Sequence, residues 1–210
     1  MSDTLIDRVR EAGEADDETS TRILDAALDR FSTFGLRRTT MDDIASSAGV
    51  GRATLYRRFA GRDEIVRAVI LRELWRFIAE VDERVSHIED PRERFVESFV
   101  GTLQAARSQP LLGRLIEIEP DLLLPFLTID AAPALAVARA YLTQELARNQ
   151  ADGHITADAD PEIVAELLVR LCQSLLLTPT GMIDPDDDAG LRDFAETYLC
   201  LLYTSPSPRD

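Results

Sequence analysis

Arginine is concentrated in one short stretch of an otherwise acidic chain. The sequence has 210 residues, with 23 basic and 38 acidic side chains, a net charge of -15 and a pI near 4.5. Residues 37–62 nevertheless hold six arginines against Asp42 and Asp43, a local charge of +4. Guanidinium groups pair with phosphate oxygens and guanine edges, so this stretch is suited to bind nucleic acid. The overall charge excludes a protein that coats nucleic acid through bulk positive charge.

Three short helices are predicted around these arginines. Apolar side chains at three- and four-residue spacing predict a first helix, which ends at Gly35. Thr40 can cap a second helix, which ends at Gly49. A third helix follows in GRATLYRRF, and a long helix is predicted over residues 62–87. This order, with a glycine in the turn between the second and third helices, is typical of a helix-turn-helix DNA-binding unit.

The third helix of such a unit must leave its outer face free for base edges in the major groove. Small side chains are expected where the second helix braces the third. The outer face is predicted to present Arg52, Ala53, Thr54 and Arg57. The alternative interpretation is a small three-helix packing unit whose arginines lie on a solvated face.

Residues 21–70 resemble the TetR family of one-component transcriptional regulators. The resemblance rests on the order and spacing of the elements in TRILDAALDRFSTFGLRRTTMDDIASSAGVGRATLYRRFAGRDEIVRAVI. It implies that Thr40 and Tyr56 bind phosphates, that Arg52 and Thr54 lie at the groove, and that Arg62 approaches a phosphate. With the neighbouring basic positions, the expected DNA contacts are Arg38, Thr40, Arg52, Ala53, Thr54, Tyr56, Arg57, Arg58 and Arg62.

Two positions depart from the family pattern. Gly51 stands where the family often has a serine or threonine cap, and glycine is a weaker but acceptable cap. Arg58 stands where histidine is common, and it adds positive charge toward the DNA backbone. Neither departure removes the helix-turn-helix pattern.

The remaining sequence is also predicted to be helical, and no segment shows the alternation of a strand. Helices are expected at 91–108, 111–118, 120–129, 132–151, 161–178 and 188–199. The predicted fold is therefore all-α, with a disordered acidic arm at 1–19, a helix-turn-helix domain at 20–66 and a larger helical domain at 67–199. The resemblance implies that the larger domain binds a small-molecule ligand and forms a homodimer.

Two sets of residues in the larger domain are candidates for these roles, although the same patterns also fit core packing within one chain. The ligand-pocket candidates are Trp75, Phe77, Phe95, Phe99, Leu103, Arg114, Phe126 and Tyr141. The dimer-interface candidates are Ile163, Leu167, Leu171, Cys172, Leu175, Leu191, Phe194, Ala195, Tyr198 and Leu199.

Other classes of protein find little support. His87 and His154 have no carboxylate or cysteine at ligand spacing, so no metal or other cofactor is expected. No signal peptide or membrane-spanning run is present, which predicts a cytoplasmic chain. An all-α enzyme is a remote alternative, because no nucleophile and base stand at usable spacing.

The sequence changes character at its end. Residues 200–210, CLLYTSPSPRD, match the in-frame translation of a sequencing-library adaptor, which predicts a non-native tail and a last helix that is cut short.

The leading hypothesis is a sequence-specific regulator that represses from a palindromic DNA operator and is released by an unknown effector. A helix-turn-helix regulator whose helical domain binds a protein partner is the alternative.

Overall fold

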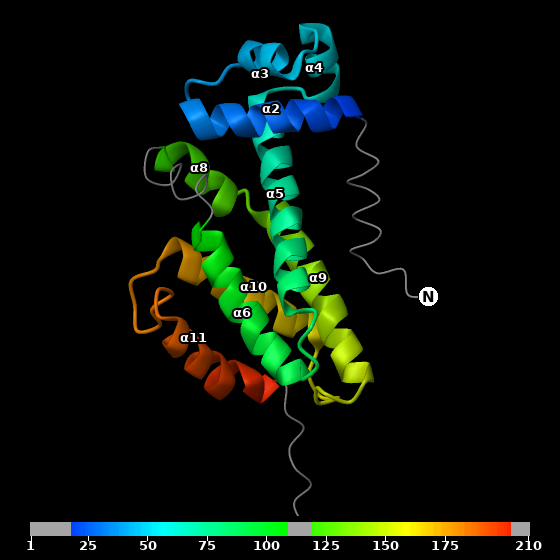
Figure 1. The fold of residues 1–210 in the computed structure, drawn as a ribbon, viewed down its shortest axis with the longest axis vertical. Helices are drawn as coiled ribbons and strands as arrows, with labels where there is room; N and C mark the ends of the chain where they lie inside the picture. The colour runs from blue at the N-terminus through cyan, green and yellow to red at the C-terminus, as the bar shows by residue number, and fades with distance from the viewer. Residues whose placement is uncertain (1–17, 109–118, 203–210) are drawn as a thin grey trace, which may run out of the picture. The chain divides into compact units, whose positions relative to one another are not determined.

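The computed structural model describes residues 18–108 and 119–202, which form helices joined by turns, with no strand among them. The prediction of an all-α fold is confirmed. The helices are α2 (Glu18–Phe34), α3 (Met41–Ala48), α4 (Arg52–Arg58), α5 (Arg62–Val85), α6 (Pro91–Ser108), α8 (Pro120–Leu127), α9 (Ala132–Ala151), α10 (Pro161–Leu177) and α11 (Asp188–Phe194) (Figure 1). A π-helical segment, Ala195–Leu199, and a 3-10 turn, Cys200–Leu202, continue α11.

Several sequence predictions fall partly or wholly outside the described residues. The predicted helix at 111–118 lies outside them, and so do residues 1–17 of the acidic arm and 203–210 of the tail. The last two positions of the arm, Glu18 and Thr19, belong to α2.

Within the described ranges, no helix taken singly is long and apolar enough to cross a membrane. The bent pair α8 and α9 meets the length and composition requirements only when both helices are counted together.

The chain divides into two compact units. The first, called the head, contains the described residues 18–76 and 119–134, and the second, called the body, contains 77–108 and 135–202. The sequence predicted a boundary at 66/67 and placed α8 in the larger domain. The structure groups α8 with the head because Leu123, only 2% exposed, lies in the head core. Leu122, Phe126 and Leu127 pack against the same core.

The head is built on the apolar stripe of α2. Ile23 and Ala27 are fully buried and Phe31 is 2% exposed. They share a core with Ile44 of α3 and Leu55 of α4. Burying a large aliphatic or aromatic side chain stabilises a fold by about 1.5–3 kcal/mol, so this stripe holds the short helices α3 and α4, which are too short to be stable alone.

Helix α3 has well-formed caps at both ends. The Thr40 hydroxyl accepts a hydrogen bond from the Asp43 N–H at 3.2 Å, and the Asp43 carboxylate accepts one from the Thr40 N–H at 3.0 Å. This reciprocal arrangement is a capping box, and it confirms the predicted helix start at Thr40. At the other end Gly49 has a φ of 64°, in the left-handed region that glycine adopts without strain.

Helix α8 is attached to the end of α2 through a carboxylate. Glu119, 7% exposed, accepts hydrogen bonds from the Leu36 N–H at 2.5 Å and the Arg37 N–H at 3.2 Å. Gly35, with a φ of 82°, makes the turn that exposes these N–H groups. A Cβ atom on Gly35 would lie 2.9 Å from the Glu119 Oε1 atom, so this position needs glycine for its conformation and for space.

The body has a separate core, formed mainly by α6, α10 and α11. Phe99, Val100 and Leu103 of α6 are buried there with Leu168 of α10 and Leu191 of α11. Helix α6 contacts both α10 and α11 (Figure 1), and the ring centroids of Phe99 and Phe194 lie 6.1 Å apart. Ion pairs at the surface, such as Arg192 with Glu97, join the same helices.

The capping box makes a pH-dependent contribution to stability. Hydrogen bonds from the Thr40 hydroxyl, then from the Thr40 N–H, hold the pKa of Asp43 below its ordinary value of 3.8. The carboxylate therefore stabilises the fold above that pH, and this stabilisation is lost as the pH falls through the lower folded-state pKa. We expect Asp43→Asn to lower the free energy of unfolding at neutral pH, with a difference from wild type that shrinks in acid, measured by urea unfolding. The same change in a Thr40→Val background should have a smaller pH-dependent effect, and an equal effect in both backgrounds would contradict the capping role.

The turn at Gly35 gives a second stability prediction. Gly35→Ala should lower the free energy of unfolding by about 1–3 kcal/mol, because the alanine would adopt a strained φ and contact the Glu119 carboxylate. Gly61→Ala is the matched control, since no heavy atom lies within 4 Å of the added Cβ position. It should change the stability by less than about 0.5 kcal/mol. Equal effects of the two substitutions in thermal or chemical unfolding would refute this account of the turn.

Candidate nucleic-acid interface

Helix α4 is anchored by apolar side chains on one side and exposed on the other. Leu55 is fully buried and Phe59, which follows the helix, is 8% exposed, both within the head core. Thr54 is half-buried. The exposed positions of the helix are Arg52, Ala53, Tyr56 and Arg57.

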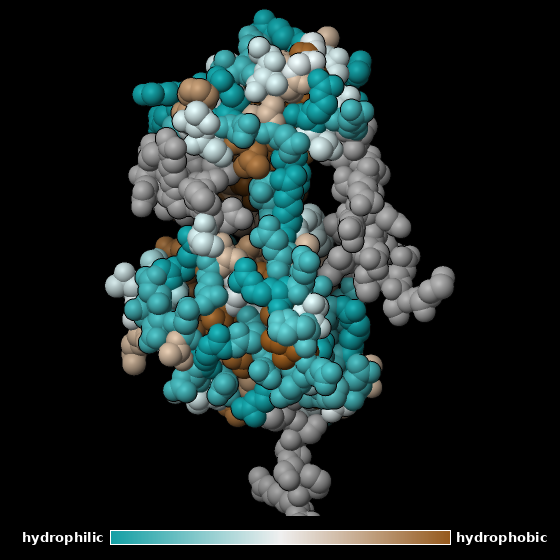
Figure 2. Space-filling view, viewed as in Figure 1, coloured by the Kyte–Doolittle hydropathy of each residue, from teal (hydrophilic) through white to brown (hydrophobic). Residues whose placement is uncertain are grey.

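The exposed side of the head is polar. Figure 2 shows mainly hydrophilic and weakly polar side chains over the visible surface of α3 and α4. The Tyr56 side chain is 49% exposed, so its hydroxyl is open to a partner. A basic and hydroxyl-bearing helix face of this kind can contact both phosphates and base edges.

The tight turn between α3 and α4 is fixed by Gly49 and by an arginine from α2. Arg22 donates hydrogen bonds from Nη2 to the carbonyl oxygens of Ala48, at 2.6 Å, and Gly49, at 3.1 Å. The Val50 N–H donates to the Ala45 carbonyl at 3.0 Å. Arg22 therefore neutralises the negative end of α3 and sets the direction in which α4 begins.

Arg52, at the start of α4, forms an ion pair with Asp42 of α3. Both side chains are more than half exposed, at 69% and 52%. An exposed pair of this kind contributes little to stability and exchanges readily for another anion. The arginine is thus held near the start of α4 and is still able to reach a DNA base or phosphate.

Arg58 and Arg62, which are also predicted to contact DNA, make hydrogen bonds to other elements of the head. The Arg58 Nη1 atom donates to the Ser20 hydroxyl at 2.9 Å, and the Arg62 Nη1 atom donates to the Leu36 carbonyl at 3.2 Å. Both side chains are half-buried. Each of them joins elements of the head in this structure, which is a role that the sequence analysis did not foresee.

The two remaining predicted contacts lie between α2 and the start of α3. Arg38 is exposed in the connection, and Thr40 is exposed at the cap of α3. The structure thus brings exposed basic and hydroxyl groups from this connection and from α4 into one small unit.

No cluster of three histidine, cysteine, aspartate or glutamate side chains that could hold a metal ion occurs in ranges 18–108 and 119–202. Burial raises the pKa of the Cys172 thiol to about 12, so this sulfur stays protonated at neutral pH.

Two family models together match most of the chain. Residues 23–69 match the family model for bacterial regulatory proteins of the tetR family, and residues 90–195 match that for the bacterial tetracyclin repressor C-terminal domain. An uncharacterized HTH-type transcriptional regulator of Mycobacterium tuberculosis is 30% identical over 176 residues, which cover 82% of this chain and 81% of the relative. The chain belongs to the TetR family of transcriptional regulators.

Further members of the TetR family are similar over most of the chain. The regulator AlkX of Mycobacterium tuberculosis is 28% identical over 75% of this chain and 74% of its own. The crystal structure of the TetR family repressor AlkX from Dietzia, implicated in biodegradation of n-alkanes, is 26% identical and has a TM-score of 0.68, covering 87% of this chain and 96% of its own. These relatives are regulators, not enzymes, and TetR family regulators bind DNA and act as dimers.

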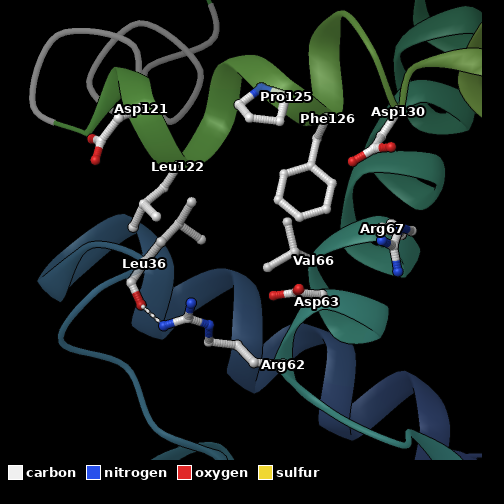
Figure 3. Close-up of a pocket in the computed structure, with 10 residues that line it drawn as sticks. All are labelled: Leu36, Arg62, Asp63, Val66, Arg67, Asp121, Leu122, Pro125, Phe126 and Asp130. Carbon is white, nitrogen blue, oxygen red and sulfur yellow. Dashed lines mark hydrogen bonds between the residues drawn. The ribbon is translucent and has the colours of Figure 1, made fainter.

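The head of this TetR family member contains a hollow of about 240 Å³ between α5 and α8. Figure 3 shows Phe126 of α8 pointing toward Val66 of α5, with Leu122 beside Leu36. Charged side chains stand at the rim, among them Arg62 and Arg67. Among the predicted pocket residues that the structure describes, Phe126 lines this hollow.

The other ligand-pocket candidates are divided between the two units. Trp75 is half-buried and belongs to the head. The candidates that belong to the body are Phe77, Phe95, Phe99, Leu103 and Tyr141. Phe99 and Leu103 are buried in the body core. The Tyr141 hydroxyl donates a hydrogen bond to Asp82 at 2.9 Å, which fixes the ring against α5. Arg114 lies outside the described residues.

The dimer candidates separate into exposed and buried residues. Ile163 and Leu167 of α10 are 58% and 57% exposed, and Tyr198 is 63% exposed. Leu191 is fully buried and Leu175 is 8% exposed, so both belong to the core of the chain and not to its surface. Ala195, Leu199 and Phe194 pack in or against the same core, as do Leu171 and Cys172. Leu191 and Ala195 thus fill the core of the single chain, and the dimer-interface role of this set stays a prediction.

Proposed function

We propose that this TetR family member is a homodimeric repressor that binds a palindromic DNA operator through α4 and is released from it by a small-molecule effector. The observation that carries the proposal is the exposed face of α4, which presents Arg52, Ala53, Tyr56 and Arg57 from a helix anchored by Leu55. Solved relatives described as TetR family repressors support the direction of regulation.

The proposed DNA contacts fall into two kinds. Arg52, Ala53 and Arg57 lie on exposed positions of α4 and are proposed to reach base edges, together with the half-buried Thr54. Thr40, Tyr56 and Arg38 are proposed to bind phosphates and so to set the register. Arg58 and Arg62 are proposed to approach the DNA backbone while they keep their hydrogen bonds to Ser20 and Leu36.

The dimer is proposed to form around α10. Ile163 and Leu167 are four positions apart and therefore lie on the same helix face, and both are more than half exposed. Apolar side chains in this position are stabilised when a second copy covers them. A two-fold symmetric pair would present two copies of α4, which requires a palindromic operator.

The effector is proposed to bind in the body near the half-buried aromatic side chains, with Phe95 and Tyr141 as candidates. A ligand that prefers one conformation of the body shifts the population of the dimer and changes the spacing of the two α4 helices. Because the operator half-sites have a fixed spacing, such a shift weakens DNA binding.

Selection of bound DNA from a random pool tests the proposed reading helix. The wild type should enrich a palindrome at moderate salt, and Arg52→Ala should lose preference at the base pairs it contacts, at a cost of about 1–3 kcal/mol each. Tyr56→Phe, which lacks only the hydroxyl, should weaken binding uniformly and keep the preference. Arg84→Ala, which removes an exposed arginine of the body away from α10, is the control and should leave both unchanged. A wild type that enriches no sequence would contradict the proposed function.

Sedimentation of the purified protein tests the proposed dimer. Leu167→Glu should weaken self-association by at least about tenfold, because it places a charge in the apolar contact. Ile129→Glu, at a position in the head that is 88% exposed, is the matched control and should leave the molecular mass unchanged. A wild type that is monomeric at micromolar concentration, or a dimer indifferent to Leu167→Glu, would refute the α10 interface.

A further inference from the structure

The connection between α2 and α3 is held by side chains that come from distant parts of the chain. Its first residue after the turn, Leu36, is 3% exposed. The Leu36 N–H donates to the Glu119 Oε2 atom at 2.5 Å, and its carbonyl accepts from the Arg62 Nη1 atom at 3.2 Å. The N–H and carbonyl groups of one buried residue thus tie the end of α2 to the starts of α8 and α5.

Glu119 is well suited to this position by charge. Successive N–H groups in a turn form a concave site that favours an anion. The carboxylate accepts from the Leu36 N–H and, through both oxygens, from the Arg37 N–H at 3.2 and 3.3 Å. Hydrogen bonds to an ionised acceptor are about twice as strong as neutral ones. The contact joins residues 83 positions apart in the sequence and holds the start of α8 against the end of α2.

The segment that Glu119 holds leads directly into the proposed DNA contacts. Arg37 is bound to Glu119 through its N–H and to Asp121 through its side chain. Arg38 follows it, and the Thr39 hydroxyl, on a residue that is 1% exposed, donates to the Gly35 carbonyl at 2.7 Å. Thr40 then caps α3. A displacement of Leu36 and Arg37 would therefore shift the start of α3 and the residues proposed to bind phosphate.

We propose that Glu119 is a positioning residue for DNA binding: its carboxylate fixes the Leu36–Arg37 backbone and thereby the α2–α3 connection in the orientation that the operator requires. The proposal rests on the proposed function. It also assigns α8 the role of holding the head in its binding-competent form, because breaking this contact lowers the competent fraction and the apparent affinity falls by the same factor.

Two variants of Glu119 and one control test the proposal on the full chain, with the DNA sequence that the wild type selects. Glu119→Gln keeps the shape but replaces one acceptor oxygen by a donor amide, and Glu119→Asp keeps the charge but shortens its reach. Both should weaken operator binding by about tenfold. Asp130→Asn removes an exposed carboxylate just after α8 that does not hold Arg37, and should change the affinity by less than about twofold.

A second measurement reports on the contact itself. The amide proton resonances of Leu36 and Arg37 should lie downfield in the wild type and move upfield in Glu119→Gln, while the circular dichroism of the helices stays the same. A folded Glu119→Gln protein with wild-type affinity overturns the proposal, and so does an equal loss in Asp130→Asn, since a general charge effect would then explain both. Wild-type affinity in Glu119→Asp would show that charge alone is needed and would overturn the hydrogen-bonding role. If the wild type selects no DNA, the proposed function fails and the positioning role fails with it, whereas an indifferent Glu119→Gln beside a binding wild type removes only the positioning role.

Discussion

The apolar stripe of α2 is the surface against which the head is assembled. Ile23, Ala27 and Phe31 are almost completely buried, and the short helices α3 and α4 lie against a core that includes them. Neither short helix could be stable in water by itself. The polar face of α4 is thus available to a partner only because the opposite face is fixed by this core. The caps and turns of the head keep the helices in the positions that this packing requires.

The charge of the chain is unevenly distributed between the exposed surface of the head and the rest of the molecule. The chain as a whole has a net charge of -15, while the exposed arginines of α4 and of the α2–α3 connection form a small basic surface. An acidic molecule is repelled by DNA wherever it approaches with another face. If α4 binds the operator as proposed, binding depends on correct docking of this helix and falls with added salt, as phosphate contacts do in general.

The head could be predicted closely from the sequence because its signals are local. The capping residue Thr40 and the glycine at position 49 stand next to the elements they define, and the spacing of apolar residues gives the buried face of α2. The attachment of α8 could not be predicted in this way. Glu119 binds backbone N–H groups, which every residue possesses, so the sequence does not mark its partner. The contact between the Gly35 turn and the distant Glu119 can be recognised only when the fold is known. Periodicity also failed to separate Leu167, which is 57% exposed, from Leu191, which is fully buried, because both lie on apolar stripes.

The place of α8 in the head has a consequence for how such regulators can be recombined. The family model for the C-terminal domain covers residues 90–195 and so includes α8, whereas the packing of Leu123 assigns this helix to the head. The head is thus discontinuous in the sequence. A chimaera of two family members that is joined within α5 would combine the α4 of one protein with the α8 of the other. The Leu36 N–H and the apolar side chains of α2 and α5 would then face an α8 segment from a different protein. An exchange of heads between members of this family should therefore succeed when the segment around residues 119–134 is transferred together with the N-terminal helices, because that segment belongs to the head and not to the body.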